Sequence, residues 1–509
     1  MRNRTSVTKW NLVFHYATIV IAIINGLVIV PFYLKFIDTA LFGAWLATGN
    51  ILVWLTIIEP GVGEVIQQKV ASSLGSKEYK NASKFITSGI IISIVISLIV
   101  VLLSLIFQLF IVQILNLSPS IDSKELLSAF QIAAIGTGFM MLSYAFVGAN
   151  QGLQSSVGIG LIFITINILG IVINLVLLFH GYGLISIAVS TLIRGAGIFL
   201  GNALYLAYRM KRNHLGLTYN RSFFIDFSKL FSFTFFSKIS STIVSNIDLI
   251  LISRFVSPET VTMLELTRRP IKIIQGFTDR VSVAFMPALS NLKGEGNIIK
   301  IKELFLKFFL IFSWVSIFII FGFISFNKNL LEVWAGKNLF IGNPINILIC
   351  ITLLIGSFTY NISNFCFSLG NIKGNSMITI LKSIIYLSFV FVFGTFFGIY
   401  GILSAALFSI IFSEAIYYPK KIVSLLEVSK KDILPLIKEN FLLITVGIIM
   451  SSAFHFFAVE IEDWIDLIVY ASIFTLLFWG IFILISTRLR IFLKDLVLKL
   501  KHSKLESKL

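Results

Sequence analysis

Cationic and amide side chains recur at helical spacing in residues 262–290, between two long apolar runs. Arg268, Lys272, Gln275 and Asp279 follow one another at steps of four, three and four residues, so they share one narrow face of a helix. Guanidinium and ammonium groups bind phosphate oxygens, and arginine can do so with two parallel hydrogen bonds. The pattern predicts a helix over residues 262–288 whose polar face receives an anionic ligand.

A second polar stripe lies in the apolar run 231–255, where Lys238, Ser241, Ser245 and Asp248 are spaced by three, four and three residues. The two segments together hold three acids, Asp248, Glu265 and Asp279, and five cations, Lys238, Arg268, Arg269, Lys272 and Arg280. Two interpretations stay open. The charges can hold a bundle interior together through internal pairs, such as Lys238 with Asp279, or they can line a basic cavity. The excess of positive charge favours the cavity.

The charged helix must either line a wet cavity or lie on the membrane surface. Arg268 to Asp279 covers about 16 Å of helix axis, roughly half the thickness of a hydrocarbon core. A charge at that depth is costly unless it meets water or a partner. A spanning helix with this stripe therefore predicts an aqueous chamber beside it.

The composition is that of an integral membrane protein. Of 509 residues, 57% are hydrophobic and 13% are charged. In soluble domains, about a quarter of all residues are charged. The net charge of +17 does not indicate a nucleic-acid partner, because the excess lies in short loops on one predicted side of the membrane. Cys350 and Cys366 are too far apart along one helix for a disulfide and are predicted to be core residues. The N-terminal apolar run is predicted to be an uncleaved first span.

Fourteen apolar runs have membrane length: 11–34, 41–59, 85–115, 126–148, 157–179, 182–208, 231–255, 262–288, 304–326, 341–369, 376–396, 398–418, 434–457 and 464–486. The two terminal tails and the alternate loops hold 30 Lys and Arg residues, and the loops on the other side hold 5. The positive-inside rule places both termini in the cytoplasm. If the helix 262–288 lay on the membrane surface, the basic loops after it would fall on the outer side of the membrane, against the positive-inside rule. The spanning alternative is therefore favoured.

The two halves of the chain resemble each other at an offset of about 218 residues. Tyr182-Gly183 corresponds to Tyr400-Gly401, and Gly152 corresponds to Gly370. Six spans per repeat place both copies in the same orientation. We therefore predict an all-α polytopic membrane protein with one six-helix bundle in residues 1–220, a second, parallel bundle in 221–425, and two further helices with a basic cytoplasmic tail in 426–509.

Four further charged residues are candidates for gating or ion coupling. Arg194 and Glu414 occupy nearly corresponding places in the repeat and are predicted to form a structural pair or, less favoured, a gate. Glu59 lies at the end of the second span, in a hinge or a helix stop, and Asp38 is better explained as a helix cap. The sequence shows no nucleotide-binding loop, catalytic triad or metal-ligand cluster, so no enzymatic activity and no cofactor are expected.

Five segments carry a resemblance to a known family: FIDTALFGAW after the first span, EPGVGEVIQQKVAS after the second, NQGLQ after the fourth, MPALSNLKGEGN after the eighth and YGILSAA opening the twelfth. Their order and spacing resemble the O-antigen and polysaccharide flippases of the MOP exporter superfamily. The resemblance implies a MOP (MATE-like) fold. It also implies translocation of an undecaprenyl-pyrophosphate-linked oligosaccharide, an O-antigen or capsular or exopolysaccharide repeat unit, from the cytoplasmic to the outer leaflet of a bacterial plasma membrane.

The cationic cavity implied by the resemblance falls on Arg268, Arg269, Lys272 and Arg280, with Lys238 and Arg194 as second choices. Related lipid II flippases place an arginine in the first span, and this chain has none there, which disfavours lipid II as the substrate. Membrane lipids are expected partners, as are a polysaccharide polymerase and glycosyltransferases. Coupling to protons or Na⁺, with Asp248 and Asp279 as candidate sites, stays open.

Two rival functions remain. A MATE-type multidrug exporter shares the predicted fold, but a pump for organic cations should have an acidic cavity. A scaffold that recruits glycosyltransferases through its basic cytoplasmic face would tolerate loss of Arg268 and Lys272, whereas a flippase would not.

Overall fold

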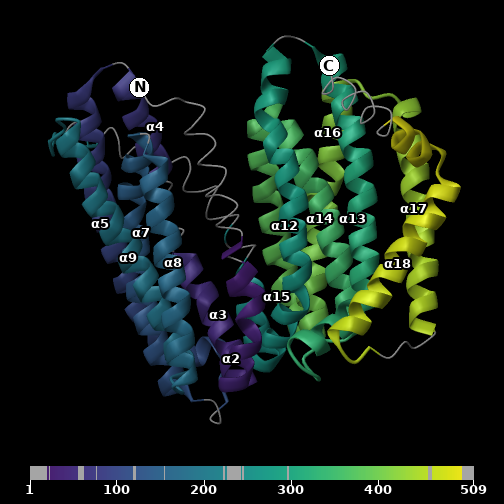
Figure 1. The fold of residues 1–509 in the computed structure, drawn as a ribbon, viewed down its shortest axis with the longest axis horizontal. Helices are drawn as coiled ribbons and strands as arrows, with labels where there is room; N and C mark the ends of the chain where they lie inside the picture. The colour runs from purple at the N-terminus through teal and green to yellow at the C-terminus, as the bar shows by residue number, and fades with distance from the viewer. Residues whose placement is uncertain are drawn as a thin grey trace, which may run out of the picture. The chain divides into compact units, whose positions relative to one another are not determined.

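The computed structural model describes residues 20–21, 23–55, 62–75, 77–118, 122–153, 155–221, 224–225, 242, 246–294, 297–456 and 461–495. Within these residues the regular structure is helical and groups into two compact units (Figure 1). The first unit comprises Met1–Met263 with Tyr386–Ile402, and the second comprises Leu264–Ile385 with Leu403–Leu509. The division into lobes 1–220 and 221–425 stays a prediction, since most of residues 226–245 fall outside the described part of the chain.

Nine helical stretches in the described residues are long and apolar enough to cross a membrane. They are α5 (Tyr79–Gln108), α7 (Ser123–Gly152), α8 (Ser156–Phe179), α9 (Gly183–Arg212), α13 (Ile298–Trp334), α14 (Asn343–Ser368), the stretch of α15 (Ile372–Ile410), η3 (Ile411–Ala415) and α16 (Ile416–Leu426), α17 (Lys430–Phe456) and α18 (Trp464–Ile485). The chain is thus a multi-pass membrane protein. These stretches account for ten predicted spans, because the one from α15 to α16 contains two.

The remaining predicted spans differ in character. Short helices η1 (Ile24–Val28), α2 (Val30–Phe36) and α3 (Thr39–Leu55) occupy the first two. The eighth, α12, is continuous over Pro258–Gly294 and carries too many charges to count as an apolar span. The seventh, predicted over 231–255, is described from Asn246 onward only.

The eleventh and twelfth predicted spans, 376–396 and 398–418, are separated by a kink inside α15. The break lies at Gly398, whose φ is +55° and ψ is −133°. Residues with a Cβ rarely adopt such a conformation, so glycine is required there. The predicted boundary at residue 397 is therefore confirmed, although helical structure continues on both sides of the kink.

Glycines bring two long helices of the first unit into close contact. A Cβ added at Gly195 of α9 would lie 2.1 Å from the carbonyl oxygen of Gly136 in α7, and one added at Gly136 would lie 2.7 Å from the backbone of Leu192. Helices in lipid gain little from apolar burial alone and associate through such close approaches of small residues. The α7–α9 pair is a packed centre of this unit.

The connection between the second and third predicted spans, residues 60–84, contains helix α4 (Val62–Gly75). Val62, Ile66 and Val70 are fully buried and are spaced by four residues, so they form one apolar stripe. The stripe is too short for a span and is interrupted by Gln67 and Lys69, which is why hydropathy alone assigned the segment to a loop. A helix here is compatible with the predicted connection between the second and third spans, whose cytoplasmic location stays a prediction.

Aromatic side chains hold the last two helices of the second unit in place. Phe474, Phe478 and Phe482 of α18 are buried and belong to one cluster with Trp314 and Phe326 of α13. Spans 13 and 14, which lie outside the predicted repeat, therefore pack as an integral part of this unit.

Candidate functional site

Helix α12 runs alongside α14 in the same direction. Its contacts advance in step along both helices: Ile341 N donates to Thr267, Gln275 donates to Leu353 O, Asn364 donates to Ser282, and Lys293 donates to Leu369 O. Thr267 to Lys293 covers about 39 Å of helix axis, more than a hydrocarbon core of about 30 Å. A helix lying along the headgroups would cross α14 at a steep angle, so this ladder of contacts favours the spanning alternative for α12.

Asp279 is the acidic centre of a polar network between α12 and α14. Its Oδ1 accepts hydrogen bonds from the Ser357 hydroxyl at 2.5 Å and from Asn361 Nδ2 at 2.9 Å. Asn361 Nδ2 also donates to Ser357 O at 2.8 Å. Gln275 Nε2 donates to Ser357 Oγ at 3.0 Å and to Leu353 O at 3.2 Å. Two of the four predicted stripe residues, Gln275 and Asp279, thus join one network inside the second unit.

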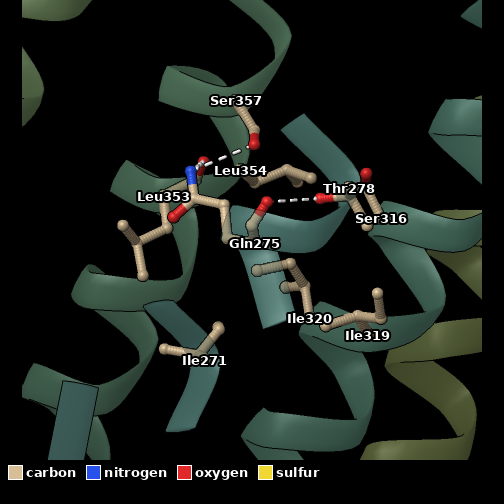
Figure 2. A pocket seen from close by; sticks show the side chains of 9 residues that line it. All are labelled: Ile271, Gln275, Thr278, Ser316, Ile319, Ile320, Leu353, Leu354 and Ser357. Atoms are coloured by element: carbon tan, nitrogen blue, oxygen red, sulfur yellow. Dashed lines mark hydrogen bonds between the residues drawn. The ribbon is translucent and has the colours of Figure 1, made fainter. Parts of the chain in front are cut away.

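A small cavity lies beside this network (Figure 2). Its volume is about 20 Å³, which is enough for one water molecule, since a water needs about 10–15 Å³ on this scale. Its lining is mostly isoleucine and leucine, with polar groups from Gln275, Thr278, Ser316 and Ser357. Figure 2 shows the Gln275 amide directed toward Ser357 across α12 and α14.

Arg268 forms a buried ion pair with Glu265 on the preceding turn of α12. Its Nε donates to Glu265 Oε2 at 2.5 Å, and the two side chains are 10% and 17% exposed. The sequence pattern counts Glu265 among the acids of this segment and predicts no partner for it. Because the Glu265 carboxylate neutralises Arg268, the arginine can bind an anionic ligand only if it leaves Glu265 or contacts both groups at once.

The other predicted cations are distributed differently. Arg269 is half-buried and Lys272 is exposed, both on α12. Arg280 lies in α12, but its side chain falls outside the described part of the structure. Lys238 and Glu59 also lie outside the described residues. Of the predicted cations of the second unit's site, the structure therefore describes the side chains of Arg268, Arg269 and Lys272.

Arg194 belongs to the interior of the first unit. Its Nη2 donates to Asn25 Oδ1 at 3.0 Å, and its buried Nε has no hydrogen-bond partner. The side chain crosses Gly170 of α8, where an added Cβ would lie 2.7 Å from Nε. The partner that the structure shows for this guanidinium is thus a neutral amide.

Glu414 pairs with Lys382 in the second unit. The distance from Lys382 Nζ to Glu414 Oε1 is 3.1 Å, and the Thr359 hydroxyl donates to Oε2 at 3.0 Å. Glu414 lies in the π-helical turn η3, an irregularity often found where a helix adjusts to place a particular side chain. Lys382 lies within the predicted span 376–396, ten residues inside α15.

Asp38 caps helix α3. Its Oδ1 accepts hydrogen bonds from the backbone N–H groups of Ala40 and Leu41 at 2.9 and 3.1 Å, the arrangement of an N-cap. The capping interpretation is confirmed. Asp248 is half-buried, and its Oδ1 accepts from the N–H of Leu249 at 2.9 Å.

The sequence analysis missed the polar residues of α14. Ser357, Asn361 and Asn364 lie four and three residues apart and so share one helix face. Their spacing within the apolar run 341–369 was visible, but single serines and asparagines are common in spanning helices. Only their contacts with α12, those of Ser357 and Asn361 with Asp279 and that of Asn364 with Ser282, give them significance.

Comparison with known proteins relates the chain to a family and to solved structures. Residues 10–293 match the family described as "Polysaccharide biosynthesis protein". The chain is similar to the lipid II flippase MurJ in an inward closed conformation, with 18% identity and a TM-score of 0.70 over 96% of this chain and 100% of that one. No curated protein sequence matches the chain.

Two further solved structures have related folds. An inward-facing multidrug resistance MATE family transporter of the MOP superfamily is 15% identical, with a TM-score of 0.61 over 78% of this chain and 94% of that one. A MOP superfamily transporter from Pyrococcus furiosus, described by the reverse polarity of its binding pocket, is 13% identical, with a TM-score of 0.53 over 83% of this chain and 96% of that one. The fold of the chain is that of the MOP superfamily.

Proposed function

Because this chain belongs to the polysaccharide biosynthesis protein family, we propose that it is a flippase for an undecaprenyl-pyrophosphate-linked oligosaccharide. The oligosaccharide would be an O-antigen or a capsular or exopolysaccharide repeat unit, carried from the cytoplasmic to the outer leaflet of a bacterial plasma membrane with both termini of the protein in the cytoplasm. The similarity of the fold to a lipid II flippase is consistent with a lipid-linked substrate.

The observation that carries the proposal is the local excess of positive charge on α12. Residues 265–272 hold three cations, Arg268, Arg269 and Lys272, against one acid, Glu265. Pairing of Arg268 with Glu265 leaves this balance unchanged, since it only joins one charge of each sign. Lys272 is exposed on the same helix, and Gln275 and Asp279 further along it bond to α14. The positive end of the stripe is thus the part suited to a diphosphate.

The physical requirement for such a protein is clear. A diphosphate bearing sugars cannot cross about 30 Å of hydrocarbon unaided, because removing its charges from water costs far more than thermal energy provides. Cations beside an aqueous chamber would stabilise the charges of the diphosphate in place of bulk water. The prenyl chain can stay in lipid. Alternating access would come from rocking of two six-helix lobes against each other, as in other transporters built from repeats.

The rival with the same fold is a MATE-type exporter of organic cations. Three cations within eight residues of α12 disfavour a positively charged drug, because like charges repel at short range. Export of cationic dyes driven by a proton or Na⁺ gradient in vesicles containing the protein would favour that rival. A scaffold role with glycosyltransferases or a polymerase as partners predicts that the charges of α12 are dispensable.

Complementation of a flippase-null strain tests the proposal. Lys272→Glu should reduce surface polysaccharide at least about tenfold, since a charge-assisted hydrogen bond contributes about 1.5–3 kcal/mol, while the membrane content of the protein stays normal. Lys272→Arg should retain function. Lys328→Ala is the matched control, because Lys328 is a cation of α13 whose side chain is 56% exposed. Normal polysaccharide with Lys272→Glu would contradict the proposal.

A further inference from the structure

A second helix follows directly after the last spanning helix, α18. Helix α18 ends at Ile485, the backbone of Ser486 is extended (φ −86°, ψ 110°), and residues 487–495 are helical again. The Ser486 hydroxyl accepts a hydrogen bond from the N–H of Leu489 at 3.0 Å, which makes Ser486 the N-cap of this second helix. Residues 487–495 are called the terminal helix below.

Two sets of contacts hold the terminal helix against the second unit. The Ser486 hydroxyl donates to Glu439 Oε2 of α17 at 2.6 Å, and both residues are buried. The apolar face of the helix packs on the aromatic cluster of α13 and α18 and consists of Leu489, Phe492 and Leu493. The Phe492 ring lies 5.9 Å from that of Trp314, edge to face. The opposite face of the terminal helix therefore points away from the bundle.

That opposite face carries positive charge around one apolar side chain. Arg490 and Lys494 are four residues apart, and Ile491 lies between them on the helix surface. All three are exposed, Ile491 to 56%. Neither cation forms an ion pair with a residue that the structure describes. Residues 487–495 hold three cations against one acid, Asp495, so the helix as a whole is basic.

We propose that this basic face binds acidic phospholipids of the adjoining leaflet, with Arg490 and Lys494 on the phosphates and Ile491 against the acyl chains. Cations close to a membrane surface attract anionic headgroups, and arginine can hold a phosphate through two parallel hydrogen bonds. Helices that lie at the membrane surface combine cations at the headgroups with apolar residues at the acyl boundary.

The connection to α18 is what favours a membrane over an acidic soluble protein as the partner. Only Ser486 separates the spanning helix from the terminal helix, so the basic face lies within about one helix diameter, roughly 10–12 Å, of the end of the span. Attraction to an acidic surface acts over about 8 Å at physiological salt. The hydrogen bond between Ser486 and Glu439 keeps the helix at this height.

This inference goes beyond the proposed function and does not depend on it, because lipid binding can be measured without any substrate. Lipid held by the terminal helix would also hold the ends of α17 and α18, which meet at Glu439 and Ser486. The two spans outside the predicted repeat would thus be fixed to one leaflet.

A fluorophore at position 491 of the full chain tests the lipid contact. Ile491→Cys can be labelled selectively, because the two native cysteines are buried. The labelled protein is placed in nanodiscs of phosphatidylcholine that contain a small fraction of either phosphatidylglycerol or phosphatidylcholine with brominated acyl chains, which quench on contact. Brominated phosphatidylglycerol should quench at least about threefold more strongly at the same mole fraction, since each cation near the surface favours an anionic headgroup. High salt should reduce this preference.

Two double variants show whether the preference belongs to the terminal helix. Arg490→Gln with Lys494→Gln should abolish it, whereas Arg490→Lys should keep it. Lys430→Gln with Lys431→Gln is the matched control, because these two exposed cations lie at the start of α17, nearer to Glu439 than to the other end of that helix, and off the terminal helix. The control pair should retain the preference. Melting curves establish that each variant is folded.

Equal quenching by the two brominated lipids would overturn the inference, as would an equal loss of the preference in both double variants. Absence of quenching by either lipid would show that the face meets water, which also overturns it and leaves an acidic soluble protein as the partner to be sought. None of these results bears on complementation of a flippase-null strain. Failure of complementation, in turn, would leave the lipid contact of the terminal helix intact.

Discussion

Arg268 and Glu265 lie one turn apart on α12 and neutralise each other within the second unit, at 2.5 Å between Nε and Oε2. Breaking a buried pair by removing one partner typically costs about 3–5 kcal/mol, because the other charge is left buried. Arg268→Ala should therefore lower the thermal stability of the purified protein strongly, and the double variant Glu265→Gln with Arg268→Gln should recover most of the loss. Melting curves of the single and double variants check this. A stable Arg268→Ala protein would show that the pair is not structural.

The Lys382–Glu414 pair should be energetically coupled. Their side chains are 23% and 13% exposed, and Thr359 holds the second carboxylate oxygen. A double-mutant cycle with Lys382→Met and Glu414→Gln should give a coupling energy of about 1 kcal/mol or more, since contacting charged groups are not additive. Thermal denaturation of the four proteins in one detergent provides the measurement. Additive effects of the two substitutions would contradict the contact.

Close packing of α7 and α9 should make Gly195 intolerant of a side chain. A Cβ there would lie 2.1 Å from Gly136 O, so Gly195→Val should destabilise the protein by about 1–3 kcal/mol through overpacking. Gly480→Ala of α18 is the control, because an added Cβ meets nothing within 4 Å. Membrane yield and melting temperature of both variants can be compared. Equal behaviour would argue against the helix contact.

Substitutions of Asp38 should separate capping from ion coupling. Asp38→Ala removes an acceptor for two backbone N–H groups and should cost about 1 kcal/mol. Asp38→Ser can still cap the helix but carries no charge, so it should retain both stability and polysaccharide export. Export is measured as surface polysaccharide in a flippase-null strain that expresses the variant, relative to the amount of the variant in the membrane. Loss of export in a stable Asp38→Ser protein would assign Asp38 a role beyond capping.

The sequence predicted the helices well and their mutual contacts poorly. Long apolar runs, the kink at Gly398 and the cap at Asp38 follow from local patterns that act within a few residues. The pairing of Glu414 with Lys382 and of Asp279 with Asn361 joins residues far apart in the chain. A helical wheel shows which residues share a face but not which helix that face meets.

The amphipathic character of α4 was also hidden from hydropathy. Val62, Ile66 and Val70 are buried, but the polar residues between them reduce the average below that of a span. The helix was missed because an average over a window discards the direction in which each side chain points.

The ladder of side-chain bonds from α14 fixes the rotation of α12 about its own axis. Gln275, Asp279 and Ser282 each meet a partner on α14 at a different height. Loss of any of these contacts removes one restraint on that rotation, and the rotation sets the direction in which the Lys272 side chain points. On the proposed flippase function, variants of Ser357 or Asn364 should therefore change which substrates are carried, even though neither residue needs to touch the substrate.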